Sequence, residues 1–219
     1  MRNKIESIFQ NISIPKMALQ TIFKHLAQHL DAPKLQRLTN ICQSITLSCK
    51  GDGAGLSSGG LIDMVVSESF ANELPNYEEC HEGEADMKIL GTPLSLKSIN
   101  GKSTIALDWS KNGEQSAKRE HFATHIMILN KKRSHWWKKG PKKKAMNIDF
   151  DQEIPPGFYL IDKQWCKENI QLSTNNKTNT LISSQYLYAM LLWSIQHGLH
   201  VPLPDANKKL TFKILNAFQ

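Results

Sequence analysis

The stretch GEADMKILGTPLSLKSI, residues 83–99, contains two segments in which polar and apolar side chains alternate. An alternation with a period of two residues predicts β-strands, here over 84–90 and 93–99. A glycine between the segments suits the positive φ of a tight hairpin turn. Paired as a hairpin, the two strands carry Asp86 and Lys97 on one face.

A carboxylate and a lysine on one face of neighbouring strands are what metal-assisted hydrolysis of a phosphodiester requires. The carboxylate of Asp86 would hold Mg²⁺, which lowers the pKa of a bound water, and Lys97 would orient that water or stabilise developing charge. The backbone carbonyl of Leu96 would add an oxygen ligand. Taken alone, the hairpin is explained better by a surface ion pair, worth at most about 1 kcal/mol.

The size and composition of the chain indicate a globular protein with one sizeable domain. It has 219 residues, of which 40% are apolar and 21% charged,. Its start has no signal-peptide pattern, and its longest apolar run, 186–193, is too short to span a bilayer,. We therefore expect a cytoplasmic protein with no membrane contact. The cysteines form no CxxC pair, which argues against a zinc ribbon: Cys42, Cys49, Cys80 and Cys166,.

The positive charge of the chain is concentrated in the segment 131–144, KKRSHWWKKGPKKK. The net charge is +7, and this segment holds eight Lys or Arg side chains and no acid, so all of the excess lies within it. Lysines neutralise DNA phosphates, and tryptophans stack on bases. The segment therefore predicts a DNA-facing insertion, with these contact residues: Lys131, Lys132, Arg133, Trp136, Trp137, Lys138, Lys139, Lys142, Lys143 and Lys144.

Periodic apolar positions predict an N-terminal helical region, 1–50, followed by an α/β core, 51–219,. A helix over 61–74 places Asp63 within its apolar arc, either as a site residue or as a structural acid. Together the segments favour an α/β fold with a central mixed sheet flanked by helices. Beyond the hairpin, we expect strands at 103–109, 122–130, 157–165 and 210–216, a polar loop at 173–180 and a helix at 183–199. The density of apolar residues in 122–130 suits a buried strand,.

The hairpin sequence ADMKILGTPLSLKSI resembles the core hairpin of the PD-(D/E)XK nuclease superfamily, which includes most type II restriction endonucleases. The resemblance puts Asp86 at the first-strand aspartate, Ser95 at the second acid and Lys97 at the lysine. The preceding helix resembles the family's first helix, which can lend an active-site acid, and Asp63 occupies its place. The resemblance implies a restriction-endonuclease-like core.

Ser95 departs from the family pattern, which usually has Asp or Glu there. Some restriction enzymes with a similar pattern carry a serine and recruit a glutamate from a following helix. Glu114 or Glu120 would then be the missing ligand, in competition with Asp63, Glu84 and Asp108. A second frame, with Asp63 as the first acid and Asp86-Met87-Lys88 as the DxK, stays open. The metal ligands implied by the first frame are Asp86, Leu96, Asp63 and Glu114.

The resemblance implies a Mg²⁺-dependent type II restriction endonuclease. Such an enzyme hydrolyses double-stranded DNA at a short specific sequence, leaves 5′-phosphate and 3′-hydroxyl ends, and acts as a homodimer on a palindrome. The same core occurs in repair and junction nucleases, which are an alternative. The alternative from another class is a non-catalytic nucleic-acid-binding protein, in which the hairpin is structural and the basic segment makes all the contacts.

Overall fold

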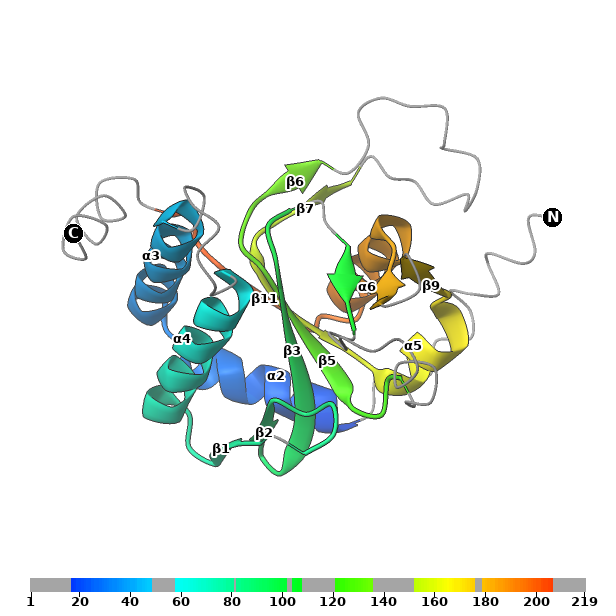
Figure 1. Cartoon of the computed structure of the whole chain (residues 1–219). Helices are drawn as coiled ribbons and strands as arrows, with labels where there is room; N and C mark the ends of the chain where they lie inside the picture. The colour runs from blue at the N-terminus through cyan, green and yellow to red at the C-terminus, as the bar shows by residue number, and fades with distance from the viewer. Residues whose placement is uncertain are drawn as a thin grey trace.

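The computed structural model describes residues 17–48, 58–80, 82–101, 104–107, 121–135, 152–175 and 179–206. Its centre is a six-stranded sheet in the order β1-β2-β3-β5-β8-β11, in which only β3 and β5 run parallel (Figure 1). The strands of this sheet are β1 (Tyr77–Glu79), β2 (Met87–Ile89), β3 (Thr92–Ile99), β5 (His125–Asn130), β8 (Gly157–Ile161) and β11 (His200–Pro202).

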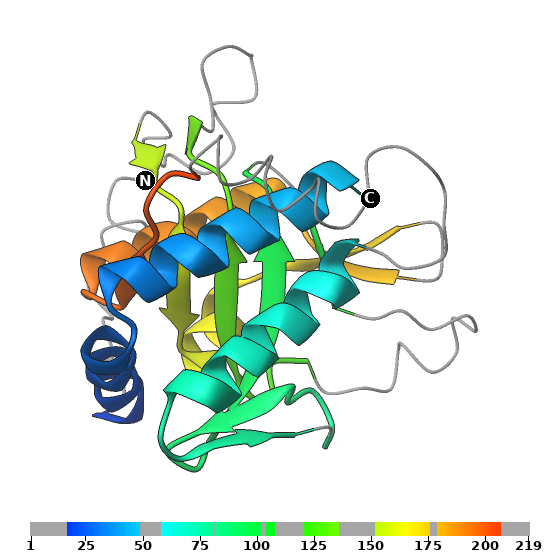
Figure 2. The ribbon, with the colours of Figure 1, turned by 90° about the vertical axis from the view of Figure 1, so that its left-hand side faces the viewer.

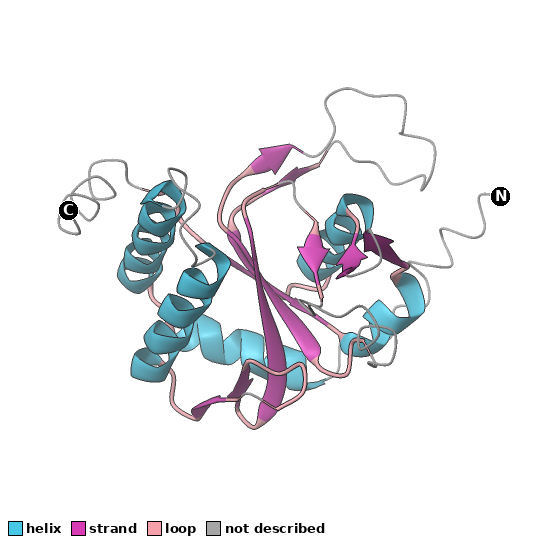
Figure 3. Cartoon of the chain, in the orientation of Figure 1, coloured by secondary structure: helices cyan, strands magenta, loops and turns pink. Residues whose placement is uncertain are grey.

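Helices cover both faces of the central sheet (Figure 3). One face is covered by α2 (Met17–His29), α3 (Ala32–Ser48) and α4 (Ser58–Glu73), and Figure 2 shows α3 and α4 crossing in front of the strands. The other face is covered by α5 (Lys163–Asn169) and α6 (Ser184–Gln196). The predicted mixed sheet flanked by helices is therefore confirmed.

Two small sheets complete the described part of the chain. One joins β4 (Ile105–Ala106), β10 (Asn179–Ile182) and β9 (Leu172–Asn175). The other pairs β6 (Ser134–His135) with β7 (Glu153–Ile154), and five of the eight Lys and Arg residues of segment 131–144 lie between these two strands in the sequence. The basic segment is thus an insertion that leaves and re-enters the fold through one short ladder.

The core is centred on β5 and β8, because every residue of these two strands is buried. Strands buried on both faces read as continuous apolar runs, which is how the sequence of β5 was interpreted. The N-terminal helices pack into the same core, since Leu19, Ile22 and Leu26 of α2 are fully buried. The boundary predicted near residue 50 falls outside the described residues. Among the described helices, none is both long and apolar enough to cross a membrane.

Two predicted elements are corrected by the structure. The strand predicted over 157–165 ends at Ile161, because the carboxylate of Asp162 accepts hydrogen bonds from the N–H groups of Gln164 and Trp165 and caps α5,. The polar loop predicted over 173–180 contains parts of β9 and β10, which pair with each other. The strand predicted over 210–216 lies outside the described residues.

Gly157 offers a test of the packing between β8 and β11. A Cβ there would meet the imidazole of His200 and lie 2.6 Å from the carbonyl oxygen of Val201. We expect Gly157→Ala to lower the free energy of unfolding by about 2–3 kcal/mol in urea denaturation, because packed neighbours must shift. Gly91→Ala should cost only about 1 kcal/mol, since that position has open space and only its positive φ opposes a side chain,. Equal losses in the two variants would contradict the packing described.

Candidate active site

The predicted hairpin is present, with β2 and β3 paired antiparallel. Met87 lies opposite Leu94, and Ile89 lies opposite Thr92. The two residues of the turn, Leu90 and Gly91, have φ values of 52° and 74°. Positive φ at both central positions is the geometry whose twist matches a two-residue hairpin. The turn therefore sets the register that brings the two strands of the hairpin together.

Asp86 lies one residue before β2 and is held against β3 by a backbone bond and by its side chain. Its N–H donates to the carbonyl of Leu94 at 2.9 Å. Its Oδ2 accepts from the N–H of Leu96 at 2.6 Å and from the Ser95 hydroxyl at 3.2 Å, and lies 3.5 Å from Lys97 Nζ. Asp86 and Lys97 thus meet as the alternation predicted. The Asp86 side chain is still 46% exposed, so the anchored carboxylate remains accessible to a ligand.

Ser95 supports the first acid in this arrangement. The residue is only 5% exposed, and its hydroxyl donates to Asp86. A carboxylate at this position would face Asp86 directly, whereas the hydroxyl adds a donor without adding charge. We interpret Ser95 as a residue that orients Asp86. A second carboxylate for a metal ion would then have to come from another element.

Asp63, on α4, is the described acid that meets this requirement. The residue is half-buried, and its Oδ1 is buried without a hydrogen-bond partner. Burial raises the pKa of Asp63 to about 6; the charges of Lys97 and Lys131 oppose this rise, and that of Asp86 adds to it. The helix packs on β3, which brings Asp63 into the field of the hairpin. The charges of Asp86, Lys97 and Lys131 therefore all act on Asp63, where α4 packs on β3.

The start of the basic segment lies beside this cluster. Lys131 directly follows β5, and its N–H donates to the carbonyl of Ile99 at the end of β3 at 3.0 Å. The sequence predicted Lys131 only as a DNA contact, and its influence on Asp63 was missed. The signal was available, because Lys131 follows directly on a strand whose apolar run predicted burial between neighbouring strands.

Arg133 is engaged within the protein. Its Nη1 donates to Glu153 Oε1 at 2.5 Å, and its Nη2 lies 3.7 Å from Asp205 Oδ2. These contacts join the two ends of the basic segment to the chain after β11. Lys132 is exposed in the structure. The remaining predicted contacts lie outside the described residues: Trp136, Trp137, Lys138, Lys139, Lys142, Lys143 and Lys144.

Comparison with known proteins agrees with this architecture. One solved structure, "Restriction endonuclease in complex with substrate DNA", matches 80% of this chain and 84% of its own, with a TM-score of 0.50 and 19% identity. The chain has a restriction-endonuclease-like fold. No family model and no curated protein sequence matches it. At this identity the likeness confirms the predicted fold, whereas the roles of the individual residues remain predictions.

The restriction-endonuclease-like fold presents an incomplete but suitable set of oxygen ligands for a divalent metal. In the described residues, no three His, Cys, Asp or Glu side chains are grouped closely enough to hold an ion. The unpartnered Oδ1 of Asp63 and the accessible carboxylate of Asp86 do fit Mg²⁺,. The carbonyl of Leu96 points to the same strand edge as its N–H, which binds Asp86,. The predicted ligand Glu114, and its rivals Glu120 and Asp108, lie outside the described residues.

The structure also gives the alternative residues Glu84 and Lys88 other neighbours. Glu84 Oε2 accepts a hydrogen bond from the N–H of Ala123 at 2.8 Å, and Glu84 Oε1 lies 3.9 Å from His121 Nδ1. This acid therefore binds the segment that precedes β5. Lys88 lies opposite Pro93 in β3 and Glu78 in β1. The ion pair with Asp86 is made by Lys97, which also acts on Asp63. The geometry therefore favours the frame that contains Lys97 over the frame that contains Lys88.

The raised pKa of Asp63 predicts a gain in stability on neutralising this residue. The folded pKa of about 6 exceeds the ordinary value of 3.8, so the folded state binds more protons and loses stability as pH rises from about 4 to about 6,. In EDTA at pH 7.5, Asp63→Asn should raise the free energy of unfolding by about 1–2 kcal/mol, a figure reduced for partial exposure. At pH 4 the gain should vanish.

Thermal and urea unfolding at the two pH values would measure this effect. Glu82→Gln, which neutralises an exposed acid, is the matched control and should change stability little at either pH,. If Asp63→Asn and Glu82→Gln behave alike at pH 7.5, the Asp63 carboxylate is not buried as described.

Proposed function

We propose that this protein is a Mg²⁺-dependent endonuclease of the restriction type, which hydrolyses double-stranded DNA at a short specific sequence. The observation that carries the proposal is the contact of Asp86 with Lys97 at 3.5 Å in a restriction-endonuclease-like fold, with the charges of both residues acting on Asp63 of α4. Support for DNA as the substrate comes from the matching structure, which is a complex with substrate DNA. The basic segment is consistent with that substrate,.

Each residue of the cluster has a part in the proposed reaction. When bound, Mg²⁺ would activate a water and neutralise charge on the scissile phosphate. Asp63 and Asp86 would hold the ion, with the carbonyl of Leu96 as a further ligand. Lys97 would orient the attacking water or stabilise the developing negative charge, since its ammonium lies against Asp86. Ser95 would keep Asp86 in place through its hydrogen bond.

The proposed enzyme acts as a homodimer. One cluster of Asp63, Asp86 and Lys97 would serve one phosphodiester at a time, so two copies related by a twofold axis would cut the two strands of a palindromic site. Lysines of the basic segment would bind the DNA backbone near each cluster, beginning with Lys131 beside Asp63,. The product ends proposed are a 5′-phosphate and a 3′-hydroxyl.

Cleavage of plasmid and genomic DNA would test the assignment of the lysine. With Mg²⁺ present, Lys97→Ala should slow cleavage by about 10²–10⁴-fold, the usual range for losing a positioned proton-transfer or charge-stabilising group. Lys88→Ala removes a lysine from the partner strand of the same hairpin and should leave the rate close to that of the wild type. Asp86→Asn and EDTA should both abolish cleavage.

The outcomes separate the proposed function from its alternatives. Loss of activity in Lys88→Ala, with Lys97→Ala active, would replace the proposed frame by the second one. Discrete fragments from genomic DNA would identify a restriction enzyme, whereas cleavage confined to branched or mismatched DNA would identify a repair or junction nuclease. Salt-sensitive DNA binding without cleavage of any substrate would favour a non-catalytic binding protein.

Because Arg133 forms ion pairs within the protein, we expect it to contribute to stability, whereas its neighbour Lys132 should contribute to DNA binding. Arg133→Ala should lower the melting temperature, because Glu153 and Asp205 lose a shared partner. Lys132→Ala should leave the melting temperature unchanged and weaken DNA binding. The slope of log K against log salt concentration should fall in magnitude by about 1, the value for one lost phosphate contact. Melting curves and DNA-binding titrations over a range of salt would measure both. A Lys132→Ala variant with unchanged DNA affinity would contradict the proposed role.

A further inference from the structure

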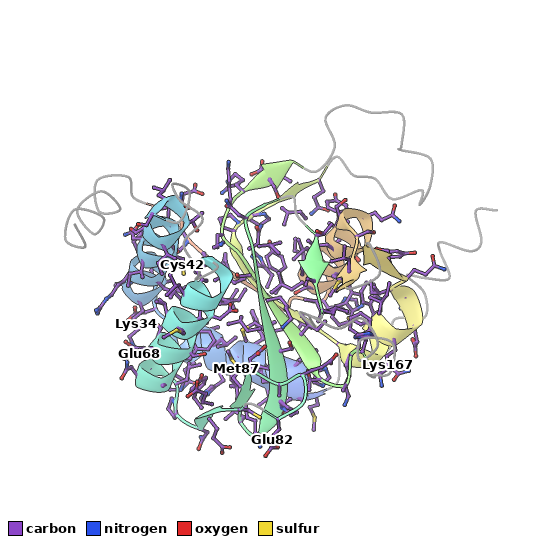
Figure 4. All side chains as sticks on the ribbon, viewed as in Figure 1. Lys34, Cys42, Glu68, Glu82, Met87 and Lys167 are labelled. Carbon is purple, nitrogen blue, oxygen red and sulfur yellow. The ribbon has the colours of Figure 1, made fainter. Side chains whose placement is uncertain are left out.

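The outer side of α4 carries surface features that the active site does not use. Met64, next to Asp63, is 67% exposed, whereas the apolar residues that α4 packs inward are buried. A groove of about 680 Å³ lies between α3 and α4, and we call it the α3/α4 groove. Figure 4 shows Lys34 and Glu68 on this side of the two helices. The groove is lined by Arg37, Leu38, Ile41, Met64, Val65 and Glu68, among others.

The two rims of the groove carry opposite charges. Arg37 lies on the α3 side and Glu68 on the α4 side, and both are exposed. Neither side chain forms an ion pair within the described part of the chain. Further along, Lys34 and Glu73 are already joined across the groove at 2.7 Å. The surface therefore combines an apolar floor, a protruding methionine and one uncompensated charge of each sign on facing rims.

We infer that the α3/α4 groove is the surface through which two copies of this chain associate. A twofold interface brings the same patch of each copy together, so it must be complementary to itself. With one copy inverted on the other, Arg37 of each copy faces Glu68 of the other, and Met64 of each copy enters the opposite groove. Apolar residues at the centre and ion pairs at the rim are the usual anatomy of such an interface.

Charge complementarity distinguishes a second copy from other occupants. The groove offers DNA no net attraction, because its two cations and two acids balance: Lys34, Arg37, Glu68 and Glu73,. The segment 207–219 has three lysines and no acid, so it complements only one of the two rims. A second copy satisfies both. The inference rests on the proposed function in naming the surface of its homodimer, and it places the interface on the helix that carries Asp63.

Sedimentation velocity of the full-length protein, without DNA, would test this surface. Wild-type protein should be a dimer at micromolar concentrations. Met64→Glu should weaken association at least about tenfold. Met17→Glu is the matched control, because Met17 is 83% exposed and lies outside the groove, and it should remain dimeric. Arg37→Glu and Glu68→Arg should each weaken the dimer, whereas the double variant should restore it, since both ion pairs are then rebuilt with reversed sign.

Several results would overturn the inference. These are a monomeric wild type, a Met64→Glu dimer as tight as that of Met17→Glu, or a charge-reversed double variant no tighter than the single ones. A wild-type monomer that dimerises only when Lys208, Lys209 and Lys213 are changed to Glu would assign the groove to the C-terminal segment. A dimer with these properties that cuts no DNA would refute the proposed endonuclease activity but not the proposed interface. A monomer that cuts both strands would refute the interface but not the activity.

Discussion

The proposed site depends on one costly arrangement, in which a buried carboxylate oxygen of Asp63 lies within the electrostatic influence of Asp86. Burial and the neighbouring acid both favour the protonated form of Asp63, and the two nearby lysines only partly offset them. An oxygen with no hydrogen-bond partner is unfavourable inside a protein unless a ligand binds it,. Such an arrangement is typical of sites where function outweighs stability.

The rest of the fold holds this arrangement in place. Because β5 and β8 are buried throughout, they form a rigid centre against which β3 is aligned in register. The N–H of Leu96 and the hydroxyl of Ser95 then anchor Asp86 from the adjacent strand. Asp63 is positioned by α4, which packs over β3. Two acids far apart along the chain are thus positioned by elements that can shift little.

Site and proposed interface share one helix. The side of α4 near the sheet carries Asp63, and its outer side carries Met64 and Glu68. Association through the outer side would leave the cluster of Asp63, Asp86 and Lys97 intact and would relate two such clusters by a twofold axis. The proposed dimer and the proposed chemistry can therefore be disturbed independently, by substitutions on different sides of the same helix.

Local signals in the sequence were enough to predict much of this protein. Alternation over residues 83–99 predicted the hairpin and the meeting of Asp86 and Lys97, and the apolar run before Lys131 predicted a buried strand. The strand predicted through residue 165 failed, because the capping bonds of Asp162 end β8 at Ile161. The hairpin of β9 and β10 was missed, since its polar residues follow no apolar period and are held by pairing with each other.

The α/β class, the hairpin and the location of the positive charge could all be predicted from the amino-acid sequence, because each depends on residues close together along the chain. The folded structure was needed to show that Lys97 forms the ion pair with Asp86, that the Ser95 hydroxyl donates to Asp86, and that Arg133 is held by Glu153 and Asp205. These outcomes depend on distances between atoms of different elements, and on burial. Neither can be read from spacing along the chain.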